Sequence, residues 1–520
     1  MRRILQLIFL MLFLTLLALS AWPYLPLPPE LFLQASPLLA GFSSLAGRTF
    51  SILLLPSLVI LATALIAGRA FCAWICPLGT LFDLFGRRKP SAGRIRNRAP
   101  KYLILCALLA AAAAGVNYTG LLDPVALLTR IFAFLAWPLV MLVVNLGLDG
   151  LRPAAEHYRW LSLAYAHAEQ PVFIGAWLSA AIVLSLLIVN RFAHRFWCRS
   201  LCPLGALLGI VARRSFIQRR VSRACTACGV CVTPCPLQAI PADNPQATRA
   251  SECSLCGTCA AVCPQNAVSY GPQKHVNVSA QTRMSKRVFI AAAGAGLAAA
   301  ALENLSPRGA LRASGLLRPP GALPENEFLQ RCVRCGACMN VCPTNTLQPL
   351  MLEQGLEGLW TPRLVPRRAG CDQTCCLCGS VCPTDALREL SLDEKKHAKI
   401  GTASIDKDRC LVWARDRLCL ICDEQCPYNA IVFQWKDGFR RPFVIEHKCN
   451  GCGFCEEQCP VAGESAIIVS SQGEIRLPSG SYVDAARERR LEFRADPGDD
   501  DFFLQPEAEA LPKDLSAKGR

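Results

Sequence analysis

Residues 225–236 read CTACGVCVTPCP, and residues 253–264 read CSLCGTCAAVCP. Both segments place four cysteines at the spacing C-x2-C-x2-C-x3-C and follow the last cysteine with proline. This spacing curls a short loop so that three thiolates face one iron–sulfur cube, while the fourth points to a neighbouring cube. The two segments therefore predict a small domain that holds two [4Fe-4S] clusters lying close together.

The same rule assigns each of the eight cysteines to one cluster. The first group is Cys225, Cys228, Cys231 and Cys263, and the second is Cys253, Cys256, Cys259 and Cys235. Zinc fits this pattern poorly, because a tetrahedral zinc site has no use for a shared fourth cysteine or a repeated proline.

Four more quartets follow downstream, each ending in Cys-Pro. Two are regular, while in the other two the first gap widens to three and to eight residues, which only enlarges the loop before the second ligand. The candidate ligands are Cys332, Cys335, Cys338 and Cys342; Cys371, Cys375, Cys378 and Cys382; Cys410, Cys419, Cys422 and Cys426; and Cys449, Cys452, Cys455 and Cys459. Neighbouring motifs can exchange fourth cysteines, or the outer pair can enclose the inner one. The sequence thus predicts six [4Fe-4S] clusters and leaves this pairing open.

The composition of the 520 residues divides the chain into two kinds of segment. Residues 1 to about 200 hold long apolar runs, and the remainder carries most of the charge and of the 30 cysteines. The net charge of +16 does not indicate nucleic-acid binding, because the basic residues concentrate beside apolar segments, where membrane orientation predicts them. We expect an α-helical membrane domain joined to α+β ferredoxin-like domains built from tandem two-cluster modules.

Four apolar segments, near 4–21, 49–67, 102–118 and 172–190, approach the roughly 17 to 25 residues that a spanning helix needs. The segments 87–101 and 191–223 are rich in arginine and lysine, and the positive-inside rule places both in the cytoplasm. A fifth apolar run, 131–148, would reverse that orientation as a full span. Because Arg130 precedes it and Pro138 and Asn145 interrupt it, we interpret this run as re-entrant or interfacial.

The membrane part contains an internal repeat. Residues 69–79 read RAFCAWICPLG and residues 195–205 read RFWCRSLCPLG, each after a predicted span. Cysteines four apart lie on one face of a helix, so Cys72, Cys76, Cys198 and Cys202 are candidate metal ligands or redox-active thiols. The alternative is that they pack the helix ends. Two cysteines remain, Cys106 and Cys376, and neither is needed as a ligand.

Residues 285–302 resemble a twin-arginine export signal, with lysine in the first basic position and an apolar stretch shorter than a stable span. Such a signal suits a domain that takes up its clusters before export. An amphipathic or buried helix is the alternative. We expect five segments: a membrane domain at 1–212, a two-cluster ferredoxin domain at 213–280, a signal or anchor with its linker at 283–325, a four-cluster domain at 326–480 and a disordered tail at 481–520.

These motifs carry a family resemblance over about nine tenths of the chain. Residues 1 to about 270, with the paired Cys-x3-Cys-Pro-Leu-Gly motifs, resemble the NapH-type membrane ferredoxins, relatives of those in nitrous oxide reductase and cytochrome oxidase assembly systems. Residues 283 to about 470 resemble the NapG/MauM-type periplasmic polyferredoxins, including the run RPPGAL at 318–323 before Arg331 and Cys332. The chain is similar to a fusion of the two.

The resemblance implies a multi-pass protein of the bacterial inner membrane with a periplasmic C-terminal domain. It implies electron transfer from membrane quinol, or from a cytoplasmic donor, to a periplasmic redox partner protein, and it does not fix that partner. We therefore expect an electron carrier or quinol dehydrogenase component with no catalytic residue of its own. A second hypothesis is a metal-ion or cofactor reductase for the maturation of a respiratory enzyme, in which the four membrane cysteines are the working thiols.

Overall fold

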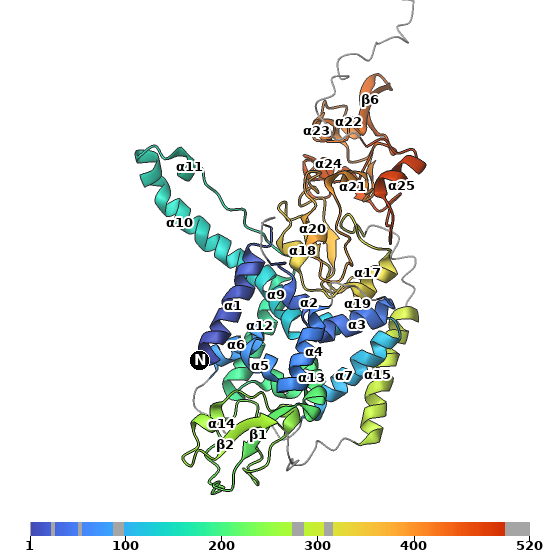
Figure 1. Cartoon of the computed structure of the whole chain (residues 1–520). Helices are drawn as coiled ribbons and strands as arrows, with labels where there is room; N and C mark the ends of the chain where they lie inside the picture. Colours follow the sequence, from blue (N-terminus) through green and yellow to red (C-terminus); the bar gives the residue numbers. More distant parts are fainter. Residues whose placement is uncertain are drawn as a thin grey trace, which may run out of the picture.

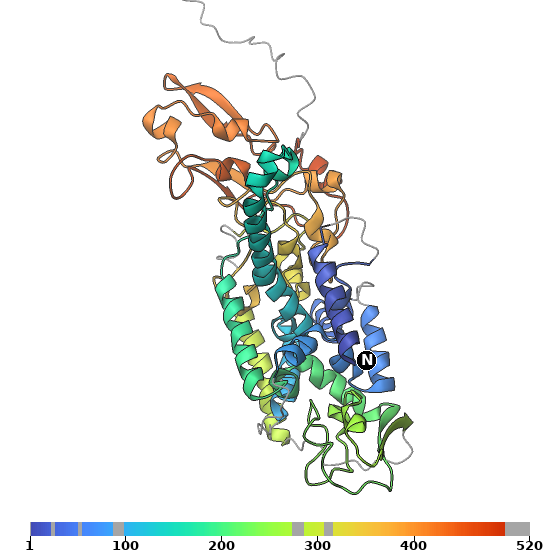
Figure 2. The same cartoon turned by 90° about the vertical axis from the view of Figure 1, so that its left-hand side faces the viewer.

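The computed structural model of the chain describes residues 2–21, 27–49, 55–86, 98–272, 285–305 and 316–493. The structure is elongated, with a helical part in the middle and one cysteine-rich domain at each end (Figures 1 and 2). The N-terminal ferredoxin domain lies at the lower end in Figure 1, and the C-terminal domain lies at the upper end. The two cysteine arrays are therefore separated by the helices.

The helical part is built from elements of very different length. They are α1 (Arg2–Ala18), α2 (Leu31–Gln34), α3 (Pro37–Gly47), α4 (Pro56–Ala67), α5 (Ala70–Trp74), α6 (Pro77–Phe85), α7 (Ala99–Ala113), α8 (Thr119–Leu122), α9 (Pro124–Ile131), the π-helix η2 (Phe132–Ala136), α10 (Trp137–His157), α11 (Leu161–Ala164), α12 (Ala176–Phe192), the π-helix η3 (Trp197–Leu201), α13 (Pro203–Val211) and the 3-10 turn η4 (Ala212–Arg214). Within the described chain, the four expected spans correspond to α1, α4, α7 and α12, and each of these helices is shorter than 18 residues.

Residues 131–148 were expected to be re-entrant or interfacial, and a re-entrant turn is wrong, because α9, η2 and α10 form one unbroken helix from Pro124 to His157. The interfacial placement stays a prediction. Among the described residues, the helix from Pro124 to His157 is the one that is long and apolar enough to cross a membrane. Asp123 caps its start by accepting hydrogen bonds from the backbone of Val125 and Ala126 at 2.9 and 3.1 Å. Pro138 does not break it, because the preceding turn widens into η2 and Pro138 falls in the first turn of α10.

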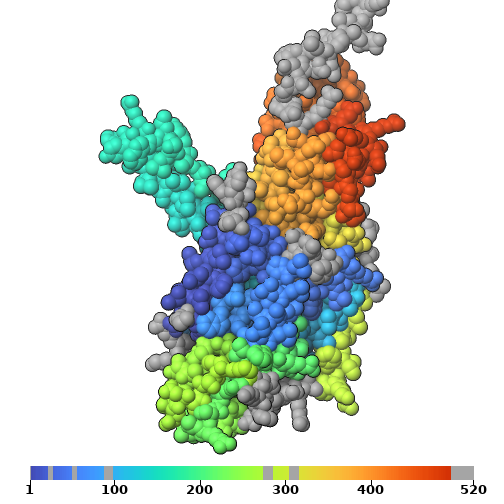
Figure 3. All heavy atoms as spheres, viewed as in Figure 1, coloured from blue at the N-terminus to red at the C-terminus, as the bar shows by residue number. Residues whose placement is uncertain are grey.

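The end of this long helix stands away from the rest of the structure, and Figure 3 shows α10 and α11 as a projecting arm. Only 22% of its most apolar window is buried. The exposed side chains on α10 are mainly aliphatic: Leu139, Val140, Leu142, Val143, Val144, Leu146 and Leu151. This helix therefore presents an apolar surface outside the protein core.

The export-signal-like segment forms helix α15 (Lys286–Leu305), which packs along α7. Gly296 allows this close approach, because a Cβ atom there would lie 2.2 Å from the Ala107 carbonyl oxygen. On the other sides Val288, Phe289, Ile290, Leu297 and Leu302 are exposed. The alternative of a buried helix is therefore wrong. The preceding residues 283 and 284, and the linker residues 306–315, lie outside the described residues.

The N-terminal ferredoxin domain is closed by one antiparallel strand pair. β1 (Ile217–Val221) precedes the first quartet and pairs with β2 (Val268–Pro272), which follows the second, with Ile217 opposite Pro272. Between them lie the short elements η5 (Ala250–Glu252) and α14 (Thr258–Ala261). The pairing brings the two ends of the cysteine segment together.

The C-terminal domain contains three further two-stranded antiparallel sheets, β3–β4, β5–β8 and β6–β7. Its elements are α17 (Glu325–Arg331), α18 (Ala337–Asn340), β3 (Leu347–Pro349), α19 (Gly355–Gly358), β4 (Pro362–Leu364), α20 (Leu377–Ser380), α21 (Leu392–His397), β5 (Thr402–Ile405), α22 (Leu411–Arg415), α23 (Ile421–Glu424), β6 (Ile431–Lys436), β7 (Phe439–Val444), α24 (Phe454–Glu457), β8 (Ile467–Ser470) and α25 (Tyr482–Glu488). The prediction of a disordered tail is wrong for residues 481–493, because α25 packs on α21 and Tyr482 is fully buried. Residues 494–520 lie outside the described residues.

Candidate functional site

The regular cysteine loops share one backbone conformation. A left-handed residue stands on each side of the second cysteine, which turns the loop so that its cysteine side chains converge. These pairs are Ala227 and Gly229, Leu255 and Gly257, Arg334 and Gly336, and Gly451 and Gly453. The glycine of each pair removes the steric cost of a Cβ atom at positive φ.

In the N-terminal array, the structure brings Cys235 from the first loop to the second. Cys235 lies close enough to Cys256 and Cys259 to interact electrostatically, and Cys253 interacts with all three. The backbone N–H of Ala239 donates to the Cys235 sulfur at 3.2 Å. This is the arrangement that the shared-ligand rule predicts for the second group of cysteines.

The first predicted group consists of Cys225, Cys228, Cys231 and Cys263. Cys231 interacts with Cys225 of its own loop and also with Cys259 of the other group. Cys263 accepts a hydrogen bond from the Ala267 backbone at 3.3 Å, in the same way as Cys235. The two groups are therefore close neighbours.

In the C-terminal domain, three pockets are each lined by four cysteines. They contain Cys332, Cys335, Cys338 and Cys382; Cys426, Cys449, Cys452 and Cys455; and Cys410, Cys419, Cys422 and Cys459. Electrostatic contacts join the remaining four, Cys371, Cys375, Cys378 and Cys342. In every set, three cysteines come from one motif and the fourth from its neighbour. The first two motifs exchange fourth cysteines, and so do the last two.

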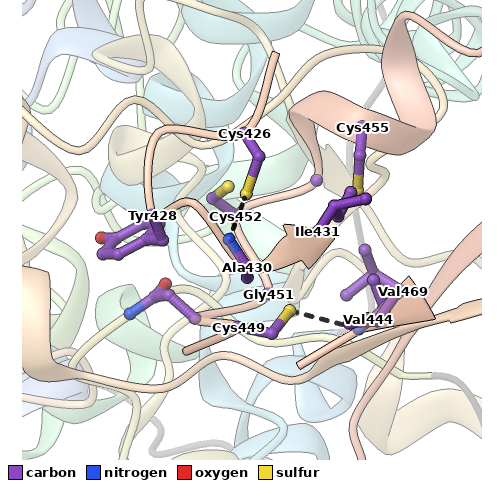
Figure 4. A pocket seen from close by; sticks show the side chains of 13 residues that line it. Cys426, Tyr428, Ala430, Ile431, Val444, Cys449, Gly451, Cys452, Cys455 and Val469 are labelled. Atoms are coloured by element: carbon purple, nitrogen blue, oxygen red, sulfur yellow. Dashed lines mark hydrogen bonds between the residues drawn. The ribbon is translucent and has the colours of Figure 1, made fainter. Parts of the chain in front are cut away.

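Figure 4 shows one of these pockets from close by. Its walls are apolar, with Ile431, Val444 and Val469 between the cysteines. The Ala430 backbone N–H donates to the Cys426 sulfur at 3.3 Å, and that of Ala403 donates to the Cys449 sulfur at 3.4 Å. Such hydrogen bonds favour a negatively charged sulfur over a neutral thiol.

The four C-terminal sets form a row. Cys338 of the first interacts with Cys378 of the second. The Cys371 backbone N–H donates to the Cys452 carbonyl at 2.7 Å, which joins the second set to the third, and Cys455 interacts with Cys422 of the fourth. The first set lies against the helical part, where the Phe134 ring would be 3.3 Å from a Cβ atom at Gly336.

In two of the C-terminal motifs the first two cysteines are further apart than in the regular motifs. The structure shows a local cause for each longer gap, which the sequence alone did not reveal. The gap of eight residues between Cys410 and Cys419 holds the short helix α22, which begins directly after Cys410. In the motif that begins with Cys371, Asp372 accepts hydrogen bonds from the backbone and the hydroxyl of Thr374, both at 2.7 Å, and so fixes the extra residue in a turn.

These donor sets fit iron–sulfur clusters. Burial and neighbouring cysteines raise the pKa of Cys335 and of Cys452 to about 12, so the thiols would stay protonated unless a cationic centre bound them. Among the described residues, no three cysteine, histidine or carboxylate side chains are arranged to hold a single metal ion. The assignment of individual cysteines as ligands stays a prediction.

The four cysteines of the membrane repeat, Cys72, Cys76, Cys198 and Cys202, are all buried, and the structure brings them together at the end of the helical part that meets the N-terminal ferredoxin domain. Cys106 is separate, with its sulfur 3.8 Å from the Phe289 carbonyl oxygen on α15. Cys376 is half-buried beside Cys375.

Sequence reasoning missed the buried arginines that stand next to the cysteine sets. Arg130 and Arg334 are each 1% exposed, and Arg130 donates to the Arg334 carbonyl oxygen at 3.1 Å beside Cys335. Arg219 donates to the Cys231 sulfur at 3.5 Å. Arg334 lies within two residues of two candidate ligands, which was the available signal, whereas Arg130 and Arg219 reach their sites only through the fold.

Three family models match parts of the chain. A 4Fe-4S binding domain matches residues 41–97 and 171–223, and 4Fe-4S dicluster domains match residues 252–347 and 417–462. The match over 252–347 combines a motif from one end of the structure with a motif from the other. It therefore reflects the repeated cysteine pattern rather than one folded unit.

Curated relatives cover about a third of the chain and most of their own length. The methylamine utilization ferredoxin-type protein MauM of Methylorubrum extorquens is 37% identical over 202 residues, which is 36% of this chain and 89% of that protein. The ferredoxin-type protein NapG of Escherichia coli is 36% identical over 205 residues, 37% of this chain and 87% of NapG. The ferredoxin-type protein NapF of Escherichia coli is 32% identical over 161 residues, 30% of this chain and 87% of NapF. The identity and coverage of MauM and NapG, together with the cysteine loops described above, show that this chain is an iron–sulfur ferredoxin-type electron-transfer protein of the MauM/NapG family.

Proposed function

We propose that this chain is a membrane-anchored conduit that carries single electrons between cysteine arrays on opposite sides of the bacterial inner membrane. The observation that carries the proposal is the arrangement of the arrays: two sets at one end of the helical part and a row of four at the other (Figure 1). A [4Fe-4S] cluster, when bound in such a set, accepts or releases one electron at a time.

Contacts at both ends of α7 connect the two arrays. At its start, Arg98 donates to the Gln238 carbonyl of the N-terminal ferredoxin domain at 2.6 Å. Beyond its end, Asn117 donates to the Gln330 carbonyl of the C-terminal domain at 2.9 Å. At about 1.5 Å per residue, the 15 residues of α7 form a helix roughly 22 Å long. One helix and its flanking residues therefore contact both cysteine-rich domains.

Two features support a membrane around the helical part. Its outer surface exposes large apolar side chains on several helices, among them Ile8 on α1, Val59 on α4 and Ile188 on α12. Arginines cluster at the end that carries the N-terminal ferredoxin domain, including the exposed Arg213 and Arg214. By the positive-inside rule that end faces the cytoplasm, which leaves the C-terminal domain in the periplasm.

Each end of the chain offers a place for a redox partner. Cys228 is exposed at the N-terminal end, where a donor could approach. At the opposite tip, Leu418, next to Cys419, is 87% exposed, and Trp435 is 75% exposed. We propose that a periplasmic acceptor docks there. Membrane quinol as the donor rests on the family resemblance alone.

The proposal is tested by iron and sulfide analysis of the full chain, purified without oxygen, followed by reductive titration under electron paramagnetic resonance. We expect at least about 24 iron atoms per chain, six clusters of four, and signals that appear and disappear with potential. Clearly fewer iron atoms in a fully loaded preparation, or clusters that stay unchanged by dithionite, would contradict the proposal.

A further inference from the structure

The internal repeat of the membrane part builds one symmetric site. The thiols of Cys72, Cys76, Cys198 and Cys202 are buried and close enough to interact electrostatically across the repeat, because Cys72 and Cys198 each act on Cys76 and on Cys202. Each Cys-Pro turn begins a helix, α6 or α13. The first pair therefore faces the second, and neither pair faces lipid.

The arginine of each repeat crosses over to the other repeat. Arg69 donates to the Cys198 carbonyl oxygen at 3.2 Å, and Arg195 donates to the Cys72 carbonyl oxygen at 3.0 Å. Both side chains are completely buried. This reciprocal pair of hydrogen bonds fixes the two cysteine segments against each other.

The glycine that ends each repeat is also required by this site. A Cβ atom at Gly79 would lie 2.8 Å from the Cys72 carbonyl oxygen, and one at Gly205 would lie 2.5 Å from the Arg69 guanidinium. The Gly205 backbone N–H donates to the Cys202 sulfur at 3.2 Å, as the ferredoxin loops do for their fourth cysteine. The repeat therefore has a common structural basis: its arginine, its two cysteines, its proline and its glycine all contribute to the same site.

The charges around the four thiols suit an anionic occupant. Five buried cations lie at this junction, namely Arg69, Arg98, Lys101, Arg195 and Arg199, and the two carboxylates that pair with them are Glu252 and Asp83. Burying unbalanced charge is costly. Some of this excess positive charge lies near Cys235 of the ferredoxin domain. The rest lies near the four thiols of the internal repeat.

We infer that Cys72, Cys76, Cys198 and Cys202 together hold one further iron–sulfur cluster, shared between the two halves of the membrane part. Each half supplies two cysteines, which are too few for a cluster alone. Four thiolates with a net negative charge match the surplus of buried cations.

The position of this centre deepens the proposed function, on which its role as a relay rests. The Arg69 backbone N–H donates to the Cys253 carbonyl oxygen at 3.4 Å, so the centre lies next to the ferredoxin set nearest the helices. One electron enters from the neighbouring set and one leaves, with no bond made or broken and no proton required.

The test compares three full-length chains purified in detergent without oxygen: the unmodified chain, the double variant Cys72→Ser with Cys198→Ser, and the control Cys106→Ser. Iron, acid-labile sulfide and Mössbauer spectra are measured for each. We expect the unmodified chain and the control to exceed about 24 iron atoms by about two or four, for a two-iron or a four-iron centre. The double variant loses only that surplus.

Three results would overturn the inference: no surplus in a fully loaded unmodified chain, a double variant with unchanged iron, or a loss of about one iron atom without sulfide. A disulfide between Cys72 and Cys76 in the anaerobic protein, found by mass spectrometry after alkylation, would do the same. The measurement on the unmodified chain decides the question even if the double variant does not fold. Missing ferredoxin iron would instead contradict the proposed function.

Discussion

At the scale of single residues, buried ion pairs join the domains. Glu252, next to Cys253, is 1% exposed and lies 2.7 Å from Arg69, 2.6 Å from Lys101 and 3.7 Å from Arg98. Burial would raise the pKa of Glu252, but these cations lower it, so the carboxylate is charged. A residue of the N-terminal ferredoxin domain thus anchors three residues of the helical part.

Replacing Glu252 with glutamine should therefore destabilise the junction strongly. Removing one partner from a buried ionic network costs about 3 to 5 kcal/mol, because the remaining charges stay buried without compensation. We expect a lower thermal midpoint and loss of iron from the N-terminal array. Asp243→Asn, which changes an exposed carboxylate in the same domain, is the control. Equal midpoints for the two variants would show that the network does not hold the domains together.

A second buried carboxylate, that of Glu325, predicts that the stability of the folded chain depends on pH. Burial opposes the charge of Glu325, but Arg318 at 2.6 Å and Arg476 at 2.6 Å lower its pKa from 4.5 to about 2. The stability that this group contributes is fully present above the unfolded pKa of 4.5 and is lost as pH falls toward 2.

The matching measurement is the thermal midpoint of the unmodified chain and of Glu325→Gln between pH 7 and pH 3.5. We expect a constant difference above about pH 5 that shrinks below pH 4.5, because protonated Glu325 resembles glutamine. Glu327→Gln, the same kind of change in the same helix, is the matched control variant. A difference that grows on acidification would mean that Glu325 is not stabilised as a carboxylate.

At the scale of elements, the sequence predicted the cysteine loops well and the helices less well. Loop spacing is a local property, so the quartets appear where we expected them. The sequence also predicted the exchange of fourth cysteines in the N-terminal array, and the structure brings Cys235 to the second group as expected. The pairing of the C-terminal motifs depends on how β5 and β8 bring distant segments together, which no spacing contains. Pro138 suggested an interruption, but η2 absorbs it within a continuous helix.

Packing between α7 and α15 gives a prediction with a closely matched control. Gly296 lies against the Ala107 carbonyl, whereas Gly294, two residues earlier, has nothing within 4 Å. Gly296→Val should push α15 away from α7 at a cost of about 1 to 3 kcal/mol, while Gly294→Val should have little effect. Hydrogen exchange of the α15 backbone measures this directly. Faster exchange in both variants, or in neither, would contradict the packing.

At the scale of the whole molecule, the sequence predicted two cysteine arrays on opposite sides of an apolar part, from the basic residues before the first array and the export-like segment before the second. The structure places the two arrays at opposite ends of the helices (Figure 2). How the C-terminal domain seats on the helices depends on long-range contacts, such as that of Asn117 with the Gln330 carbonyl, which no sequence pattern contains. The four cysteines of the internal repeat lie at the end of the helical part that meets the N-terminal ferredoxin domain. This order supports transfer across the helical part rather than within one domain.

Electron transfer across a sealed bilayer tests this directly. The full chain, loaded with iron, is placed in liposomes that contain a membrane-impermeant electron acceptor, and an impermeant reductant is added outside. We predict that the trapped acceptor is reduced only in vesicles that contain the chain, and that Cys332→Ser with Cys335→Ser, but not Cys376→Ser, slows this reduction at least tenfold, equivalent to about 1.4 kcal/mol in the barrier. An acceptor that stays oxidised, although the chain is fully loaded and present in both orientations, would contradict the conduit.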